Sequence, residues 1–334
     1  MAIVEAPAAP PARPARRRAV VTVLVWLVLA PGLIWAVIRL GGFERGLLVP
    51  LLAFTPYAAG WSLLPLLLAL ATRRWTAASI ALVAAAGLIA AVLPRALPDR
   101  DRGPSGGVPL TVMTSNMLFG GADPATIVRL VRENDVAVLA VQEFTPQGRA
   151  ALAAAGLEVL LPYSSLGDEP GASGSGVYSR FPVTDGATRR NGGGFRQSHA
   201  TIQPPGAGPL IVESAHPLAP SDLGRLPGWK SDLDSEPVPS ADGPLRILIG
   251  DFNATLDHAA LRRLIASGYR DAADVTGQGL VRTWPDPSRP LPPITIDHVL
   301  ADQRIGVRKV SVHDVPRSDH RAVIATLDVP AVKR

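Results

Sequence analysis

The chain has 334 residues, of which 47% are hydrophobic and 33 are prolines, and it contains no cysteine. This length suits two structural units, and the lack of cysteine excludes disulfides, zinc–thiolate sites and thiol nucleophiles. Residues 1–102 hold eleven of the 33 basic residues but four of the 28 acidic ones, which leaves 22 basic and 24 acidic residues in 103–334. The high pI therefore belongs to the N-terminal third and indicates no nucleic-acid surface elsewhere.

The N-terminal third is predicted to be a membrane segment. Residues 1–18 are mostly Ala, Pro and Arg and predict a disordered tail. Charge-free stretches in 19–95 are each long enough to cross a hydrocarbon core of about 30 Å, and they predict three transmembrane helices at about 19–38, 47–71 and 76–94. A cleaved signal peptide is the alternative for the first stretch, but its apolar length and the two later stretches favour membrane helices.

Arginine distribution predicts the orientation of this segment. Four arginines precede the first predicted helix and two more follow the second, six in all on one side against five on the other, and the densest cluster precedes the first helix. Positive residues in short loops favour the cytoplasmic side. We therefore expect a multi-pass protein of the cell membrane with its N-terminus inside and three crossings. The linker 96–107 would then lead to an extracytoplasmic domain at 108–330.

Strand and helix patterns alternate early in the C-terminal region, and strands predominate later. Apolar and β-branched runs predict strands at 108–115, 136–141, 157–161, 209–214, 245–250, 294–300, 307–313 and 321–327. Helices are predicted at 123–133, 146–155, 257–267 and, weakly, 222–234. Glycine clusters separate further short strands within 171–201. This order predicts two sheets packed face to face with helices outside.

Polar residues recur where the apolar strands end. Asp251 and Asn253 follow a buried run and are two residues apart, so an extended backbone projects both from one face. An Asx-rich turn is the structural alternative. Asp297 lies inside an apolar run, where a buried charge requires a partner. The positions at or next to strand ends, which together predict one site, are Asn116, Glu143, His216, Asp251, Asn253, Asp297, His298, Ser318, Asp319 and His320.

These motifs, in this order, resemble the endonuclease/exonuclease/phosphatase superfamily. The matching segments are Asn116, Gln142–Glu143, 178–183, His216, 250–253, 296–298 and 318–320, and the resemblance covers about residues 108–328. The fold that it implies is a four-layer αββα sandwich. The membrane segment lies outside the resemblance.

The resemblance also implies roles for individual residues. Asn116, Glu143 and Asp319 would hold a divalent cation, Mg²⁺ or Mn²⁺, and hard oxygen ligands agree with that choice. The catalytic residues would be His216, Asp251, Asn253, Asp297 and His320. Among these, Asp297 would orient His320, Asp251 would orient the nucleophile or protonate the leaving group, and His216 and Asn253 would contact phosphate oxygens.

Three features depart from the family pattern. Leu118 stands where many nucleases of the family carry an acid, and Ala322 replaces a usual proline. Residues 222–236, where a substrate-facing helix would lie, are rich in Pro, Gly and Asp. The first departure weakens the analogy with base-excision nucleases.

The sequence therefore predicts a membrane-anchored, divalent-metal-dependent phosphoesterase that hydrolyses phosphodiester or phosphomonoester bonds outside the cytoplasm. Its partners would be the bilayer and a phosphoester substrate, which is a lipid head group, a small phosphodiester or a nucleic acid. No protein partner is inferred. The alternatives are an anchored endonuclease or exonuclease acting on DNA or RNA, a non-catalytic binding module, and a serine hydrolase using Ser175 or Ser318.

Overall fold

A computed structural model describes residues 13–286 and 288–332 of the chain. The chain divides into two compact units. The first comprises residues 1–43 and 55–92, and the second comprises residues 44–54 and 93–334. Residues 1–12 of the predicted tail lie outside the described residues.

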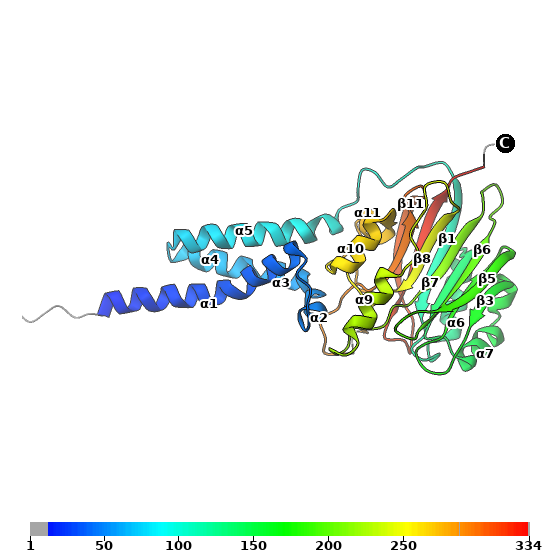
Figure 1. Ribbon diagram of the computed structural model, residues 1–334, viewed down its shortest axis with the longest axis horizontal. Helices are drawn as coiled ribbons and strands as arrows, with labels where there is room; N and C mark the ends of the chain where they lie inside the picture. Colours follow the sequence, from blue (N-terminus) through cyan, green and yellow to red (C-terminus); the bar gives the residue numbers. More distant parts are fainter. Residues whose placement is uncertain (1–12, 287, 333–334) are drawn as a thin grey trace, which may run out of the picture. The chain divides into compact units, whose positions relative to one another are not determined.

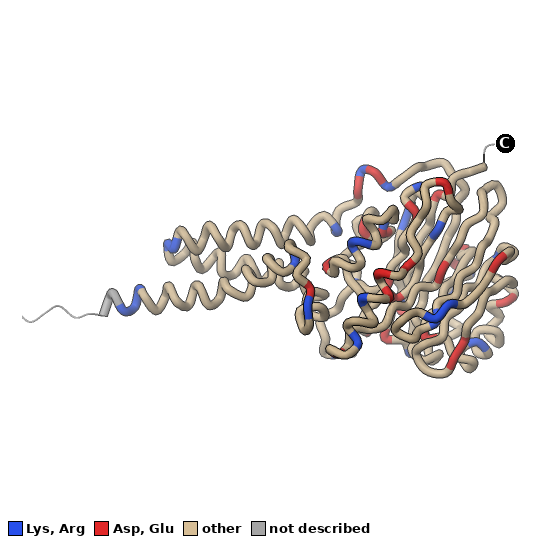
Figure 2. The backbone as a smooth tube through the Cα atoms, in the orientation of Figure 1, with Lys and Arg blue, Asp and Glu red and all other residues tan. Residues whose placement is uncertain are grey.

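The first unit is built from apolar helices. They are α1 (Arg13–Gly41), α3 (Thr55–Trp61), α4 (Leu63–Ala71) and α5 (Trp75–Val92). Leu29 of α1 packs against Ala69 of α4 and Ala81 of α5. Residues 19–38 of α1 and the whole of α4 and α5 lack charged residues, whereas acidic residues are spread through the second unit (Figure 2). By length and composition, Arg16–Gly41 and Trp75–Ala96 are candidate membrane spans, and Thr55–Ala71 is a shorter apolar helix.

Two N-terminal predictions need correction. The predicted span 47–71 is not one helix, because α2 (Leu48–Leu52) is separate from α3 and belongs to the second unit. Pro50 and Pro56 fall in this stretch, and a proline ring removes a backbone donor and disfavours a continuous helix. Within residues 13–286 and 288–332, two helices are therefore long and apolar enough to cross a membrane, where three were predicted. In addition, α1 already begins at Arg13, within the segment predicted to be disordered.

The second unit contains two six-stranded sheets. In spatial order the first consists of β11 (Gly306–Asp314), β12 (Arg321–Val329), β1 (Val108–Asn116), β2 (Val138–Gln142), β4 (Ser175–Ser179) and β3 (Tyr163–Gly167). The second consists of β5 (Val183–Arg190), β6 (Arg196–Ile202), β7 (Leu210–Ala215), β8 (Leu245–Asp251), β10 (Asp297–Asp302) and β9 (Tyr269–Asp271). Each sheet has a parallel pair at its centre, β1 with β2 and β7 with β8, and its other pairs are antiparallel.

Buried aliphatic side chains join the sheets face to face. Val112 and Val138 of the first sheet and Val212, Ile247 and Val299 of the second belong to one core cluster, and each is at most 1% exposed. Fully buried strands need no polar alternation, which explains the nearly continuous apolar runs in β2 and β8.

Helices cover both outer faces of this sandwich (Figure 1). One face carries α6 (Pro124–Glu133), α7 (Pro146–Ala154) and α8 (Leu157–Leu160). The other carries α9 (Leu226–Asp234) and α10 (Ala259–Ala266), packed on Leu248 and Leu300. Two short elements, η1 (Leu93–Ala96) and α11 (Ala272–Val275), complete the unit. The four-layer αββα sandwich is confirmed.

Local sequence explains most of these elements, and it also explains why one predicted strand is wrong. The side chain of Asp123 accepts a hydrogen bond from Thr126 N at 2.8 Å and caps α6, which has Pro124 at its first position. The predicted strand 157–161 is wrong, because Leu157–Leu160 is the short helix α8. Its short sequence, three apolar residues and Glu158, shows no periodicity that separates a strand from a helical turn.

Candidate active site

The predicted site residues gather at one end of the two parallel strand pairs. Asn116 ends β1 and pairs with Gln142 at the end of β2, so Glu143 follows directly beside it. Asp251 ends β8, and His216 follows the neighbouring strand β7. Ligands of parallel sheets bind outside the carboxyl ends of the strands, because chemically active side chains leave the buried sheet there.

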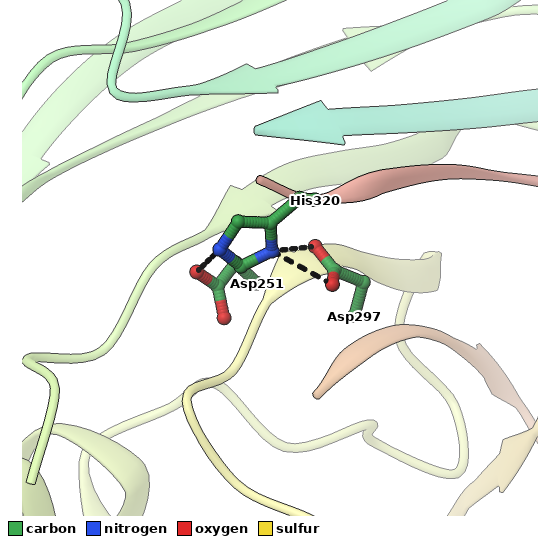
Figure 3. Close-up of side chains that lie close together, drawn as sticks. All are labelled: Asp251, Asp297 and His320. Atoms are coloured by element: carbon green, nitrogen blue, oxygen red, sulfur yellow. Dashed lines mark hydrogen bonds and ion pairs between the residues drawn. The ribbon is translucent and has the colours of Figure 1, made fainter. Parts of the chain in front are cut away.

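His320 lies between two carboxylates (Figure 3). Its Nδ1 atom is 2.9 Å from Oδ2 of Asp297, and its Nε2 atom is 3.6 Å from Oδ2 of Asp251. Asp251 and Asp297 are direct partners in the antiparallel pairing of β8 and β10. All three side chains are buried. The register of two strands thus places one acid on each side of the imidazole.

The two carboxylates control the charge of this imidazole. Burial by itself disfavours protonation of His320, but the charges of Asp297 and Asp251 outweigh it and raise the pKa of His320 to about 10. Burial also raises the pKa of Asp251. At neutral pH, His320 is therefore a cation that donates Nδ1–H to Asp297 and presents Nε2–H on the other side.

Asn116 connects this group to Glu143. Its Nδ2 atom donates to Asp251 Oδ2 at 3.1 Å and to Glu143 Oε1 at 3.3 Å. The other oxygen of Glu143 accepts from Phe119 N at 2.9 Å. Glu143 has φ 51°, in the left-handed region that costs a non-glycine residue about 1–3 kcal/mol. Burial raises the pKa of Glu143, against the hydrogen bonds from Phe119 and Asn116.

The carboxylate of Asp319 is a further candidate metal ligand, besides that of Glu143. Its Oδ2 atom accepts from Trp284 Nε1 at 3.1 Å and lies 3.2 Å from Arg289. Its Oδ1 atom is buried and has no hydrogen-bond partner among the described residues. A buried carboxylate oxygen without a donor is costly, and a cation satisfies it. Glu143 and Asp319 therefore fit a hard divalent ion by donor type. Asn116 turns its Nδ2 toward Glu143, and its Oδ1 accepts from Leu118 N at 2.9 Å, so it would bind such an ion through the second lone pair of Oδ1.

Another set of donors also lies close together. Single ligand atoms from Asp251, Asp297 and His320 are all within 4.8 Å of one another. In this set Asp297 already pairs with Nδ1 of His320, and a metal bound to the ring would have to displace a proton from Nδ1 or Nε2. The arrangement suits an acid–base group better than a cation site.

His216 and Asn253 border the same group. His216 Nε2 is 3.7 Å from Asp251 Oδ2, whereas its Nδ1 is buried without a hydrogen-bond partner among the described residues. Burial lowers the pKa of His216 to about 4, so this ring is neutral at pH 7. Asn253 has φ 48° and donates from Nδ2 to the Pro217 carbonyl at 3.0 Å. A neutral imidazole and an amide are suitable for contacting phosphate oxygens.

His298 belongs to a separate pair, although it adjoins Asp297 in sequence. Its Nδ1 atom is 2.6 Å from Asp271 Oδ2, and its Nε2 atom is 2.9 Å from the Ala254 carbonyl. Successive residues of a strand point to opposite faces, so His298 faces away from His320. The pair connects β9 and β10 to the loop after β8.

A cavity of about 510 Å³ opens at the site. Glu143, His216, Asp251, Asp319 and His320 line it. Sequence reasoning missed several other lining residues, which come from segments without a local motif: Pro50, Ala53, Phe54, Phe195, Trp284, Arg289 and Ile294. The only available indication was that Trp284 and Ile294 flank a proline-rich loop just before the Asp297 motif.

The serine alternatives do not find support in this geometry. Ser175 is buried in β4, where its hydroxyl accepts from Ser198 N at 3.1 Å. The Ser318 hydroxyl donates to the Asn116 carbonyl at 2.8 Å and accepts from His320 N at 3.1 Å. Across residues 13–286 and 288–332, no hydrogen bond joins either hydroxyl to the His320 ring. A nucleophilic serine requires such contact with its base.

Comparisons with known proteins agree with this site. The pattern of the Endonuclease/Exonuclease/phosphatase family matches residues 113–320. This covers more than half of the chain, which therefore belongs to that family. Its members are metal-dependent phosphoric ester hydrolases, and the chain is an enzyme of this class. No curated protein matches the sequence.

Solved structures share the fold at low identity. An endonuclease/exonuclease/phosphatase from Beutenbergia cavernae DSM 12333 has a TM-score of 0.51 and 20% identity, over 66% of this chain and 72% of that one. Humanized D. rerio TDP2 has a TM-score of 0.54 and 13% identity, over 66% and 99%. A family protein from Bacteroides thetaiotaomicron has a TM-score of 0.52 and 14% identity, over 68% and 100%. These likenesses concern the fold alone.

Proposed function

We propose that the protein is a membrane-anchored phosphoesterase that depends on a divalent metal and acts outside the cytoplasm. The observation that carries the proposal is the His320 imidazole held between Asp251 and Asp297 beside a cavity that Glu143 also lines. Hydrolysis of a phosphoester requires charge neutralisation, a positioned water and a proton source for the leaving group. Residues able to meet each need lie around this cavity.

Each of these residues has a distinct chemical task. Asp297 fixes the orientation of His320, so that the Nε2–H of the cation can donate to a phosphoryl oxygen. Asp251 accepts hydrogen bonds from Asn116 Nδ2 and from the Asn253 backbone. They hold its carboxylate where it can orient the attacking water or, after taking a proton from that water, protonate the leaving group. A Mg²⁺ or Mn²⁺ ion held by Asn116, Glu143 and Asp319 would supply Lewis-acid stabilisation of the developing charge.

The surface charge favours a small or lipid phosphoester over long nucleic acid. Arg180, Arg189, Arg190 and Arg196 are the arginines closest to a basic stripe in the sequence, but each pairs with a carboxylate. Arg180 pairs with Asp135, and Arg190 and Arg196 both pair with Glu169. Arg189 pairs with Glu213 and Glu236. Affinity for nucleic acid requires cations free to neutralise several phosphates.

The membrane part of the proposal rests on composition. The apolar helices Arg16–Gly41 and Trp75–Ala96 are long enough to cross a bilayer. Arg16, Arg17 and Arg18 lie at the start of the first of these helices and favour a cytoplasmic N-terminus. If Thr55–Ala71 crosses as well, the phosphoesterase unit lies on the extracytoplasmic side.

The direct test uses the full chain in detergent or nanodiscs with Mg²⁺. We expect it to hydrolyse a chromogenic phosphodiester such as methyl 4-nitrophenyl phosphate, and the His320→Ala variant to lose about 10³-fold or more in kcat. His313→Ala is the matched control, since His313 is partly exposed and contacts Ser311. Equal rates for wild type and His320→Ala, or no turnover of any phosphoester with Mg²⁺ or Mn²⁺, would refute the proposal.

A further inference from the structure

The segment Glu44–Phe54, which follows the first apolar helix in sequence, is a structural part of the phosphoesterase unit. The carboxylate of Glu44 accepts a hydrogen bond from Ala259 N at the start of α10. Val49 is 4% exposed and belongs to the core cluster that contains Trp229 and Leu261. Both polar and apolar contacts therefore attach this segment to the rest of the phosphoesterase unit.

His258 specifies the position of this segment. Its Nδ1 atom accepts a hydrogen bond from Thr255 N at 2.9 Å, so the proton of the neutral ring must be on Nε2. Nε2–H then donates to the Val49 carbonyl at 2.9 Å. Burial lowers the pKa of His258, which keeps the ring neutral and this tautomer in place. The contact is directional and buried, so it positions the backbone of α2.

This attachment places apolar side chains in the active-site cavity. Pro50, Ala53 and Phe54 line the same cavity as Asp251 and His320. Ala219, Pro220 and Ile294 extend the apolar surface. The cavity lining thus combines acids, imidazoles and the cations Arg225 and Arg289 with apolar side chains, some of which come from Glu44–Phe54.

The polar and the apolar lining residues differ in what they can bind. Acids, imidazoles and guanidinium groups suit the phosphoryl group, whereas apolar side chains gain affinity by removing hydrocarbon from water. The segment also adjoins α1 and α3 in sequence, so it lies next to the apolar helices along the chain.

We propose that Pro50, Ala53 and Phe54 form an apolar subsite for the alkyl or acyl part of an amphiphilic phosphoester. This inference rests on the proposed phosphoesterase activity and names the class of substrate. Glu44–Phe54 then has a role in selecting the substrate in addition to joining two helices.

The test measures how turnover depends on chain length. Full-length protein in nanodiscs is given alkyl 4-nitrophenyl phosphates with methyl, butyl or octyl groups. For wild type, we expect kcat/KM to rise by up to about fourfold for each of the first few methylenes, as burial of each group allows. Phe54→Ala should flatten this dependence, so that its kcat/KM values for the butyl and octyl esters approach its own value for the methyl ester.

Leu51→Ala is the matched control, because Leu51 belongs to the same segment, is 45% exposed and does not line the cavity. Leu51→Ala should keep the chain-length dependence. A loss confined to the lining variants would show that the dependence comes from the subsite and not from partitioning of longer esters into the nanodisc. Pro50→Ser is a second lining variant in case Phe54→Ala fails to turn over the methyl ester. If both lining variants keep the full dependence, or wild type shows none, the subsite is refuted while the phosphoesterase stands. No hydrolysis of any ester would refute both.

Discussion

His320 Nδ1 lies 2.9 Å from Asp297 Oδ2, and both side chains are buried. A buried carboxylate without a partner is costly, and so is a buried imidazolium, so each residue justifies the burial of the other. Asp297 stands at the start of β10 and His320 just before β12, in different sheets. Their contact therefore joins the two halves of the sandwich at the active site.

The first prediction is that Asp297 and His320 act as one unit. Asp297→Asn and His320→Ala should each lower kcat by about 10³-fold, and the double variant should be hardly worse than the poorer single variant. The reason is that Asp297 acts only by orienting and charging His320. The measurement is kcat of the four proteins with Mg²⁺. Losses that multiply in the double variant would show that the two residues act independently.

The second prediction concerns the metal. Glu143→Gln keeps the size of the side chain but removes its negative charge, so we expect activity to fall by about 100-fold or more and the Mg²⁺ concentration for half-activation to rise. Excess chelator should abolish wild-type activity. Glu158→Gln is the control, since Glu158 is exposed on α8. Full activity in chelator would exclude the metal mechanism.

The third prediction is a pH-dependent contribution to stability from His298 and Asp271. Burial opposes protonation of His298, but the neighbouring Asp271 raises its pKa above the usual 6.5. A group whose pKa is higher in the folded than in the unfolded state stabilises the folded protein. This stabilisation is complete below the unfolded pKa of about 6.5 and is lost as the pH rises through the folded pKa.

His298→Gln should therefore destabilise the protein most below about pH 6, by about 3 kcal/mol, and less at alkaline pH. Thermal unfolding of the detergent-solubilised chain, followed by tryptophan fluorescence at several pH values, measures this. His199→Gln is the control. A penalty that grows with rising pH would contradict the assignment of charge.

The fourth prediction concerns topology. The chain has no cysteine, so a single introduced thiol can be labelled without background. Ser105→Cys, in the segment that precedes β1, should react with an impermeant thiol reagent on intact cells. Thr72→Cys, between the apolar helices α4 and α5, should react only after lysis. Labelling of Ser105→Cys only after lysis would indicate an even number of crossings.

The fifth prediction is that long duplex DNA is a poor substrate. The candidate basic stripe is neutralised by Asp135, Glu169, Glu213 and Glu236. At physiological salt and matched phosphate, plasmid DNA should compete weakly with a lipid or small phosphodiester. A higher specificity constant for plasmid DNA would replace the phosphoesterase proposal with an anchored nuclease.

Sequence reasoning succeeded where a local pattern has one structural outcome. Apolar runs followed by Asn116, Glu143 or Asp251 identify buried strands and the point at which they end. It failed at Leu157–Leu160, where three apolar residues and Glu158 are too few to separate a strand from a helical turn. It also failed at 47–71, because hydropathy alone does not register how prolines divide a helix.

The sequence by itself determined the class of enzyme, the αββα fold and the residue types of the site, because these follow from local motifs and their order. Only the tertiary structure decided which of these residues meet. His298 pairs with Asp271, while its neighbour Asp297 pairs with His320, because adjacent residues of a strand face opposite sides. Phe54 and Trp284 line the cavity through packing between distant segments, and no local pattern encodes such contacts.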